Sequence, residues 1–258
     1  MTRDQWWVVT DLDGTLMDHS YCWEAAASAI SSLQNKGIPI IPCTSKTAEE
    51  VRLFRKQAGL TDPFIVENGG AIHGQSEDGE EWSVSLGPSH RQLRPELDAL
   101  SAALGEPLLA LEDLSASQGK ALLGLEGDAL LCAQRRQWSV PFVPVPLSVR
   151  SQLRALAEQR GLALVEGNRM SHLLGKTVSK GAALQQLRLR LNSPDAKVLG
   201  LGDSPNDLPL LEAADIAVVV PGPSGPHPAF KDHLASGRYQ LAPLSHASGW
   251  AEAVKQLF

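Results

Sequence analysis

Short apolar runs alternate with longer amphipathic segments over the first third of the chain. Residues 6–10 read WWVVT and residues 38–44 read IPIIPCT, and uninterrupted runs of this kind suit strands that are buried on both faces. Residues 20–37 and 47–60 instead repeat apolar positions at helical spacing. Residues 63–74, PFIVENGGAIHG, predict a third strand that runs into a glycine turn. This β-α-β-α-β order predicts an α/β fold with a doubly wound parallel sheet.

The same alternation returns near the end of the chain. Residues 179–191 have helical spacing, and residues 196–204 predict a strand that ends in an acid. A second helical segment at 206–214 and an apolar run at 215–220 follow. The two halves together predict one core sheet built from both ends of the chain.

The segment between the halves has a different character. Helical stretches such as RPELDALSAALG alternate there with short β-rich runs such as WSVPFVPV and GLALVEG. We interpret this segment as a smaller inserted αβ domain. The expected boundaries are 1–87 for the first part of the core, 88–168 for the inserted domain and 169–258 for the second part of the core.

The composition restricts the classes of protein to which the chain can belong. Of the 258 residues, 43% are hydrophobic and 20% are charged, as in ordinary globular domains, and the net charge of −6 argues against nucleic-acid binding as the main function. The three cysteines form no C-x-x-C motif, which favours reduced thiols over a zinc site or a disulfide framework. The N-terminus has no basic and apolar signal segment, and no apolar run approaches the roughly 20 residues that cross a bilayer. We expect a cytoplasmic protein that does not enter a membrane, while its oligomeric state stays open.

Polar side chains follow the predicted core strands where each strand ends. Because ligands bind beyond the carboxyl ends of parallel strands, these side chains are expected to surround one crevice. They are Asp11 and Asp13, then Thr44 and Ser45, then Glu67 and Asn68, and finally Asp203, with Lys180 opening the preceding helix. Carboxylates suit a hard cation such as Mg²⁺, and a hydroxyl and an ammonium suit a phosphate. The sequence therefore predicts a site for Mg²⁺ and a phosphate.

Four motifs carry a resemblance to a known family. DLDGTLMD, CTSKT, VSKG and GLGDSPNDLPLL occur in this order and span both halves of the chain. A lone D-x-D is unspecific, but together these motifs resemble those of the haloacid dehalogenase superfamily of aspartate-nucleophile phosphatases. The resemblance implies a Rossmann-like core with a type II cap inserted between the second and third motifs.

The resemblance also implies a role for each motif residue. Asp11 would attack phosphorus to form an aspartyl-phosphate, and Asp13 would protonate the leaving oxygen and later help to activate water. Thr44 would donate a hydrogen bond to a phosphoryl oxygen. Lys180 would neutralise charge on the nucleophile and the phosphoryl group.

The same resemblance implies a magnesium site. Asp11, the backbone carbonyl of Asp13, and Asp203 would bind Mg²⁺. Asp207 is expected either to bind the ion directly or, like Asn206, to support its ligands, and a purely structural capping role is the alternative for both.

Within the superfamily the chain is most similar to mannosyl-3-phosphoglycerate phosphatases. The similarity lies in SKT, ENGGAI, AQRRQWSVPF and GNRMSHLLG, and it implies a small phosphorylated sugar acid as substrate. The chain departs from the family pattern at Trp138 and Val140, which leaves the sugar open. The residues expected to bind this substrate are Ser45, Lys46, Glu67, Asn68, Arg136, Arg169 and His172.

All of these substrate-binding residues except Ser45 have a structural alternative. Arg136, Arg169 and His172 bind the glycerate carboxylate or, alternatively, are a solvated helix arginine, a turn arginine and a core histidine. Lys46 contacts the substrate or only flanks a helix, and the pair at 67–68 shapes the pocket or only ends a strand. The alternative functions are a phosphatase for another sugar phosphate, a mutase of similar fold, and, more distantly, a receiver-like switch that is phosphorylated on an aspartate.

Overall fold

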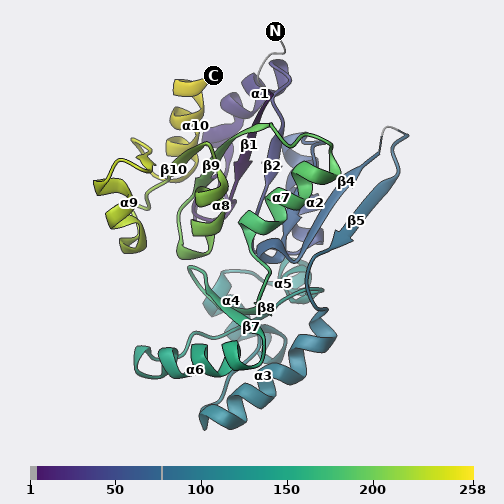
Figure 1. The fold of residues 1–258 in the computed structure, drawn as a ribbon, viewed down its shortest axis with the longest axis vertical. Coiled ribbons are helices and arrows are strands. Elements are labelled where there is room, and N and C mark those ends of the chain that lie inside the picture. The colour runs from purple at the N-terminus through teal and green to yellow at the C-terminus, as the bar shows by residue number, and fades with distance from the viewer. Residues whose placement is uncertain (1–4, 77) are drawn as a thin grey trace.

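The computed structural model describes residues 5–76 and 78–258. Figure 1 shows a larger unit, which contains both ends of the chain, above a smaller unit built from its middle. No helix among the described residues has both the length and the apolar character that crossing a bilayer requires. The predicted α/β fold with a parallel core sheet is confirmed.

A five-stranded parallel sheet forms the centre of the larger unit. Its strand order is β11-β10-β9-β1-β2, so strands from the two ends of the chain lie side by side. The strands are β1 (Trp6–Thr10), β2 (Ile40–Pro42), β9 (Lys197–Gly202), β10 (Ile216–Val219) and β11 (Gln240–Leu241). The direct pairing of β1 with β9 brings the first and the last sequence motifs to one sheet edge.

The predicted third strand and its glycine turn are present, but a further strand follows the turn. Residues 63–74 form two antiparallel strands, and a short 3-10 turn at Glu67–Gly69 separates them. These strands are β3 (Phe64–Val66) and β4 (Ala71–Gln75), and β5 (Glu81–Ser85) completes the small sheet. A parallel bridge between Cys43 and Ile65 continues the core sheet into β3.

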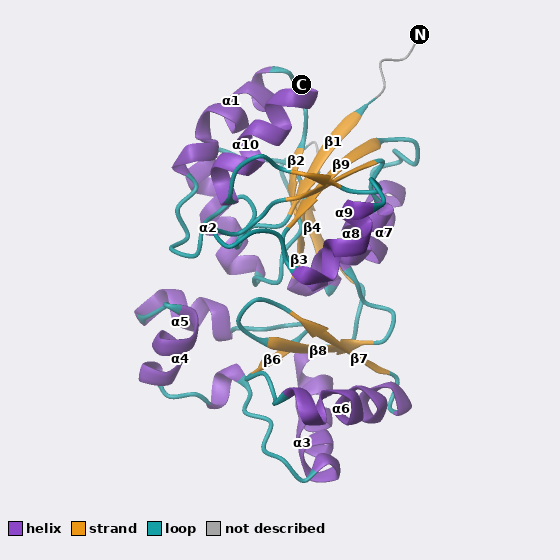
Figure 2. Ribbon diagram, turned by 90° about the vertical axis from the view of Figure 1, so that its left-hand side faces the viewer, coloured by secondary structure: helices purple, strands orange, loops and turns teal. Residues whose placement is uncertain are grey.

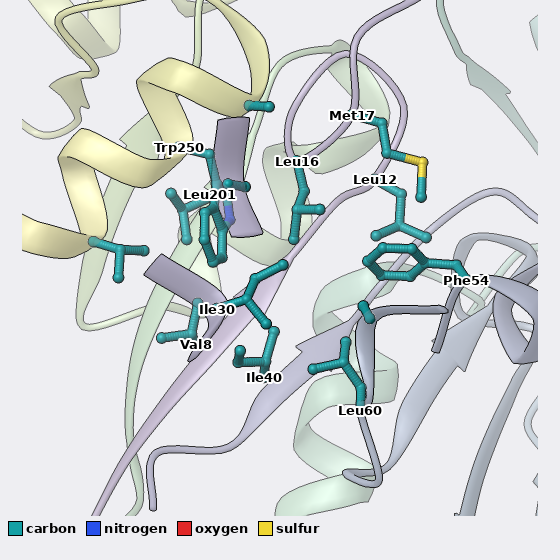
Figure 3. Packing of buried hydrophobic residues seen from close by; sticks show 14 of the residues in the cluster. Val8, Leu12, Leu16, Met17, Ile30, Ile40, Phe54, Leu60, Leu201 and Trp250 are labelled. Carbon is teal, nitrogen blue, oxygen red and sulfur yellow. The ribbon is translucent and has the colours of Figure 1, made fainter. Parts of the chain in front are cut away.

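Helices cover both faces of the core sheet, which explains the uninterrupted apolar runs of its strands (Figure 2). Val8 packs with Ile30 and Trp250 on one face, whereas Trp7 and Val9 pack on the other face. Figure 3 shows the first of these clusters. The helices of the larger unit are α1 (Ala27–Asn35), α2 (Ala48–Ala58), α7 (Lys180–Arg190), α8 (Leu208–Ala213), α9 (Lys231–Ala235) and α10 (His246–Leu257).

The smaller unit has its own antiparallel sheet, in the order β6-β8-β7. Its strands are β6 (Val140–Phe142), β7 (Leu162–Glu166) and β8 (Ser171–Gly175). Its helices are α3 (His90–Leu104), α4 (Ala116–Leu123), α5 (Gly127–Gln134) and α6 (Leu147–Gln159). Apolar side chains of α3, α6 and this sheet form a separate core.

One expected boundary does not match the strand pairing. The sequence placed residues 169–258 in the core, but β8 pairs with both β6 and β7 of the smaller sheet. An isolated apolar strand gives no signal of the sheet it joins, because pairing is decided by tertiary contacts. We therefore propose that the inserted domain extends to Gly175.

Candidate active site

Two aspartates follow β1 at the carboxyl edge of the core sheet. Asp11 is buried, and its backbone N–H donates to the carbonyl of Leu201 on β9 at 3.0 Å. Gly14 lets the chain turn beyond them, with φ of +88°, and a Cβ at this position would lie 2.4 Å from Oδ2 of Asp203. A larger residue at position 14 would therefore displace the acid at the end of β9.

Lys180 links the last and the first motifs through a buried ammonium. Its Nζ donates to Oδ1 of Asp11 and to Oδ1 of Asp207, both at 2.6 Å, and its side chain has no exposed area. Burial alone would lower the pKa of Lys180, but the two carboxylates outweigh it and raise that pKa. Burial also raises the pKa of Asp11 to about 7, although Lys180 opposes the shift. Lys180 thus fixes the orientation of the Asp11 carboxylate.

Three carboxylates gather beside this ammonium. Oxygens of Asp11, Asp203 and Asp207 all lie within 4.8 Å of one another. Asp207 is oriented by the backbone N–H groups of Asp203 and Ser204, each 3.0 Å from its Oδ2. Burial, with the charges of Asp11 and Asp207 next, raises the pKa of Asp203 well above its usual value.

This all-oxygen donor set fits a divalent cation such as Mg²⁺. One lysine offsets only part of the charge of three carboxylates, and a bound cation would relieve their mutual repulsion. Asp203 also accepts hydrogen bonds from Thr15 Oγ1 at 3.0 Å and from Asn168 Nδ2 at 2.7 Å. The role of the Asp13 carbonyl as a further ligand stays a prediction.

The second catalytic candidate, Asp13, lies beside Lys46. Lys46 Nζ is 2.9 Å from Oδ2 of Asp13 and 3.4 Å from Oε1 of Glu50. Burial would lower the pKa of Lys46, but these two carboxylates outweigh it and raise that pKa. Lys46 immediately precedes Thr47, the N-cap of α2, so it flanks that helix. The alternative, that Lys46 contacts the substrate, stays a prediction.

Thr44 and Asn68 lie beneath the site. Thr44 is fully buried, and its Oγ1 accepts from the backbone N–H of Lys46 at 3.2 Å. Asn68 accepts a hydrogen bond from Asn206 Nδ2 at 3.0 Å. The phosphate contact expected of Thr44 stays a prediction, and Asn68 supports Asn206.

Glu67 makes structural contacts that the sequence did not predict. It is fully buried, and its carboxylate accepts from the backbone N–H groups of Gln137 at 2.8 Å and Trp138 at 3.0 Å. The Ser139 hydroxyl donates to the same carboxylate at 2.6 Å. These bonds involve both carboxylate oxygens, so Glu67 anchors the chain that leads into β6. It does not line the cavity between the two units, and a substrate contact of Glu67 stays a prediction.

A cavity of about 80 Å³ lies between the two units above Asp11. The predicted residues that line it are Asp11, Asp13, Ser45, Lys46, Arg136, Arg169, His172 and Asn206. Residues that the sequence analysis did not single out also line it, namely His19, Tyr21, Glu50 and Asn168. Two of these residues could have been identified from the sequence. Glu50 follows Lys46 by four residues, and Asn168 lies in GNRMSHLLG, one of the segments that carry the family resemblance.

The two cavity arginines donate to carbonyl and hydroxyl groups. Arg136 donates to the carbonyls of Ala133 and Ser45. Arg169 donates to the Tyr21 hydroxyl and to the carbonyls of Leu123 and His19. Within the described residues, neither guanidinium is within 4.0 Å of a carboxylate.

His172 is buried in the cavity wall on β8. Burial, and after it the charges of Arg136 and Lys180, lower the pKa of His172 to about 3. Its Nδ1 is buried and has no hydrogen-bond partner among the described residues. Without a bound anion the side chain is therefore neutral near pH 7, and its contact with a substrate carboxylate stays a prediction.

Comparison with known proteins agrees with the motifs. A family model described as haloacid dehalogenase-like hydrolase matches residues 8–85 and 149–221. A haloacid dehalogenase-like hydrolase from B. subtilis has a similar structure, with a TM-score of 0.71 and 17% identity over 98% of this chain and 99% of that chain. At this identity the structural likeness supports the fold alone.

Two curated relatives are more similar in sequence, and both are named glucosyl-3-phosphoglycerate/mannosyl-3-phosphoglycerate phosphatase. The protein from Persephonella marina is 31% identical over 228 residues, which cover 83% of this chain and 84% of the relative. The protein from Methanococcoides burtonii is 32% identical over 270 residues, which cover 97% of this chain and 96% of the relative. The resemblance inferred from the motifs is confirmed, and nothing in the match supports a receiver. This chain belongs to the haloacid dehalogenase-like hydrolase family.

Proposed function

We propose that this protein is a Mg²⁺-dependent phosphatase that hydrolyses the phosphate monoester of mannosyl-3-phosphoglycerate or of its glucosyl counterpart. The products would be the glycosylglycerate and inorganic phosphate. The names of the two relatives support this substrate class. The observation that carries the proposal is one cavity that joins Asp11 to Arg136 and Arg169, neither of which has a carboxylate within 4.0 Å among the described residues.

The chemistry begins at Asp11. Its carboxylate attacks phosphorus, a carboxylate O–P bond forms, and the ester P–O bond breaks. Lys180 holds Oδ1 of Asp11 at 2.6 Å, which fixes the carboxylate for this attack. Asp11, Asp203 and Asp207 would hold Mg²⁺, which when bound offsets negative charge on the phosphoryl oxygens.

Asp13 is placed to move protons in both halves of the reaction. It would give a proton to the departing glycerate oxygen and then take one from the water that attacks phosphorus. That attack breaks the bond to Asp11 and releases phosphate. Asp13 and Asp11 line the same cavity, which supports a role for both carboxylates at one phosphate ester.

The two arginines support a substrate that carries a second anionic group besides its phosphate. The phosphate is already served by Lys180 and by the cation that the acids would hold. Each guanidinium donates to neutral carbonyls or a hydroxyl, and the charge of Arg136 acts on Glu50 only from beyond ion-pair distance, so a substrate carboxylate could pair directly with either arginine. The glycerate portion supplies that carboxylate.

The test is a substrate comparison with purified protein. We expect p-nitrophenyl phosphate to be hydrolysed with Mg²⁺ and not with EDTA. We also expect far higher kcat/KM for mannosyl- or glucosyl-3-phosphoglycerate than for mannose 6-phosphate. Equal kcat/KM for hexose monophosphates would refute the substrate and leave a general sugar-phosphate phosphatase. No hydrolysis of any phosphate ester would refute the activity itself.

We include a cytoplasmic location in the proposal. Cys22, Cys43 and Cys132 are free, which suits a compartment that keeps thiols reduced.

A further inference from the structure

Tyr21 lies in the loop that follows β1, residues 11–23, and it lines the cavity between the two units. Its hydroxyl donates to the carbonyl of Leu123, at the end of α4, at 2.8 Å. The same hydroxyl accepts from Nη1 of Arg169 at 2.8 Å. Leu123 and Arg169 both belong to the smaller unit, because the inserted domain is proposed to extend to Gly175. The hydroxyl of Tyr21 therefore connects the loop that follows β1 to the smaller unit.

The ring of Tyr21 faces a different group. Lys46 Nζ lies 4.4 Å from the ring centroid, within the range of a cation–π contact. The same ammonium is 2.9 Å from Oδ2 of Asp13. One continuous series of contacts thus runs from Leu123 through Tyr21 and Lys46 to the carboxylate of Asp13.

The backbone of Tyr21 supports a role beyond packing. Its φ is +64°, in the left-handed region that a bulky residue seldom adopts. Such a conformation persists where the surrounding contacts determine it, and it concentrates at functional sites. The hydroxyl of Tyr21 contacts the smaller unit, and its ring contacts the Lys46 ammonium of the larger unit. Tyr21 is therefore suited to connect the two units.

We infer that Tyr21 is a positioning residue: docking of the inserted domain fixes its ring, which holds Lys46 against Asp13 in the orientation that proton transfer needs. The inference rests on the proposed phosphatase function. Tyr21 itself transfers no proton, and its hydroxyl is occupied by Leu123 and Arg169. Its effect is therefore expected in kcat, which depends on Asp13, rather than in KM.

Tyr21→Phe removes the two hydroxyl contacts and keeps the ring. We expect kcat to fall between about twofold and tenfold, the effect of losing one or two ordinary hydrogen bonds, with KM changed less than about twofold. Lys46→Met should remove the route to Asp13, so adding Tyr21→Phe to it should change kcat no further. Lys46→Arg keeps a cation over the ring, and adding Tyr21→Phe to it should still lower kcat.

Arg135→Ala is the matched control. Arg135 pairs with Glu49 across the two units at 3.0 Å but does not line the cavity. Its loss should leave kcat within about twofold of the wild-type value, as for an exposed ion pair. All variants are compared per active site after circular dichroism has shown that they fold.

The inference is overturned if Tyr21→Phe leaves kcat unchanged, if its effect is the same with or without Lys46, or if Arg135→Ala reproduces it. The wild-type substrate comparison separates this result from the proposed function. If the wild type prefers another phosphate ester, the substrate assignment fails, and the same variants are measured with that ester.

Discussion

Replacing Lys180 with methionine tests the electrostatic centre of the site. The wild-type ammonium is buried and contacts Asp11 and Asp207 at 2.6 Å each. Methionine has a similar length and no charge, so the variant leaves the acids, including Asp203, without a buried cation. We expect a large loss of stability and a loss of phosphatase activity.

The magnitude follows from the burial. Removing one partner of a buried ion pair typically costs about 3–5 kcal/mol, because the remaining charge is uncompensated. Asp11, whose pKa is about 7 in the metal-free protein, can take up a proton and reduce this cost. We therefore expect the free energy of unfolding to fall by about 3 kcal/mol near neutral pH in EDTA. Since protonation of an acid removes negative charge, the deficit should shrink as the pH is lowered.

The assay is urea unfolding followed by circular dichroism, in EDTA and again with Mg²⁺. A cation bound by the acids should restore part of the lost stability, so the deficit should be smaller with Mg²⁺. The exposed Lys56→Met variant is the control and should stay within about 0.5 kcal/mol of the wild type. A deficit below about 1 kcal/mol for Lys180→Met would refute the view that this lysine balances the acids.

Three further predictions address single residues. Asp11→Asn should abolish hydrolysis while the circular dichroism spectrum is unchanged, because an amide is a very poor nucleophile; activity above a few per cent of wild type would contradict the covalent mechanism. Asp203→Ala should raise the Mg²⁺ concentration for half-maximal activity, and an unchanged titration would remove Asp203 from the ligands. For His172, whose pKa falls from 6.5 to about 3 on folding, the unfolded chain binds the proton first as the pH drops. Wild-type stability should therefore lose about 2 kcal/mol from this group between about pH 6.5 and pH 5, and His172→Gln should flatten that part of the urea-unfolding profile; parallel profiles would contradict the assignment.

The catalytic centre was accessible to sequence reasoning because its geometry is local to strand ends. Asp11 directly follows β1 and Asp203 directly follows β9, and these strands pair in parallel. Any doubly wound sheet with this strand pairing brings the two acids to the same edge. Lys180 begins the helix that precedes β9, so it too is placed by the order of elements rather than by loop detail.

The contacts of Glu67 could not be predicted from the sequence because a strand end does not fix where a side chain points. Glu67 and Asn68 both have positive φ, of 49° and 58°. This turn directs the Glu67 carboxylate to the backbone at Gln137 and Trp138, and no periodicity in the sequence reports such a turn. The position of Glu67 in its motif therefore did not predict its hydrogen-bond partners.

The contacts of Tyr21 show why the cavity residues near the inserted domain were harder to predict than the acids at the strand ends. Its partners Lys46, Leu123 and Arg169 are separated from it by 25 to more than 140 residues, and Leu123 and Arg169 reach it only where the two units meet. Arg169 makes the same point, because the charge expected to bind a carboxylate also ties Tyr21 to α4. A substrate that engages Arg169 must therefore compete with, or reinforce, the contacts that hold the inserted domain in place. Substrate recognition and domain docking share this side chain, so a substitution at Arg169 should alter both together.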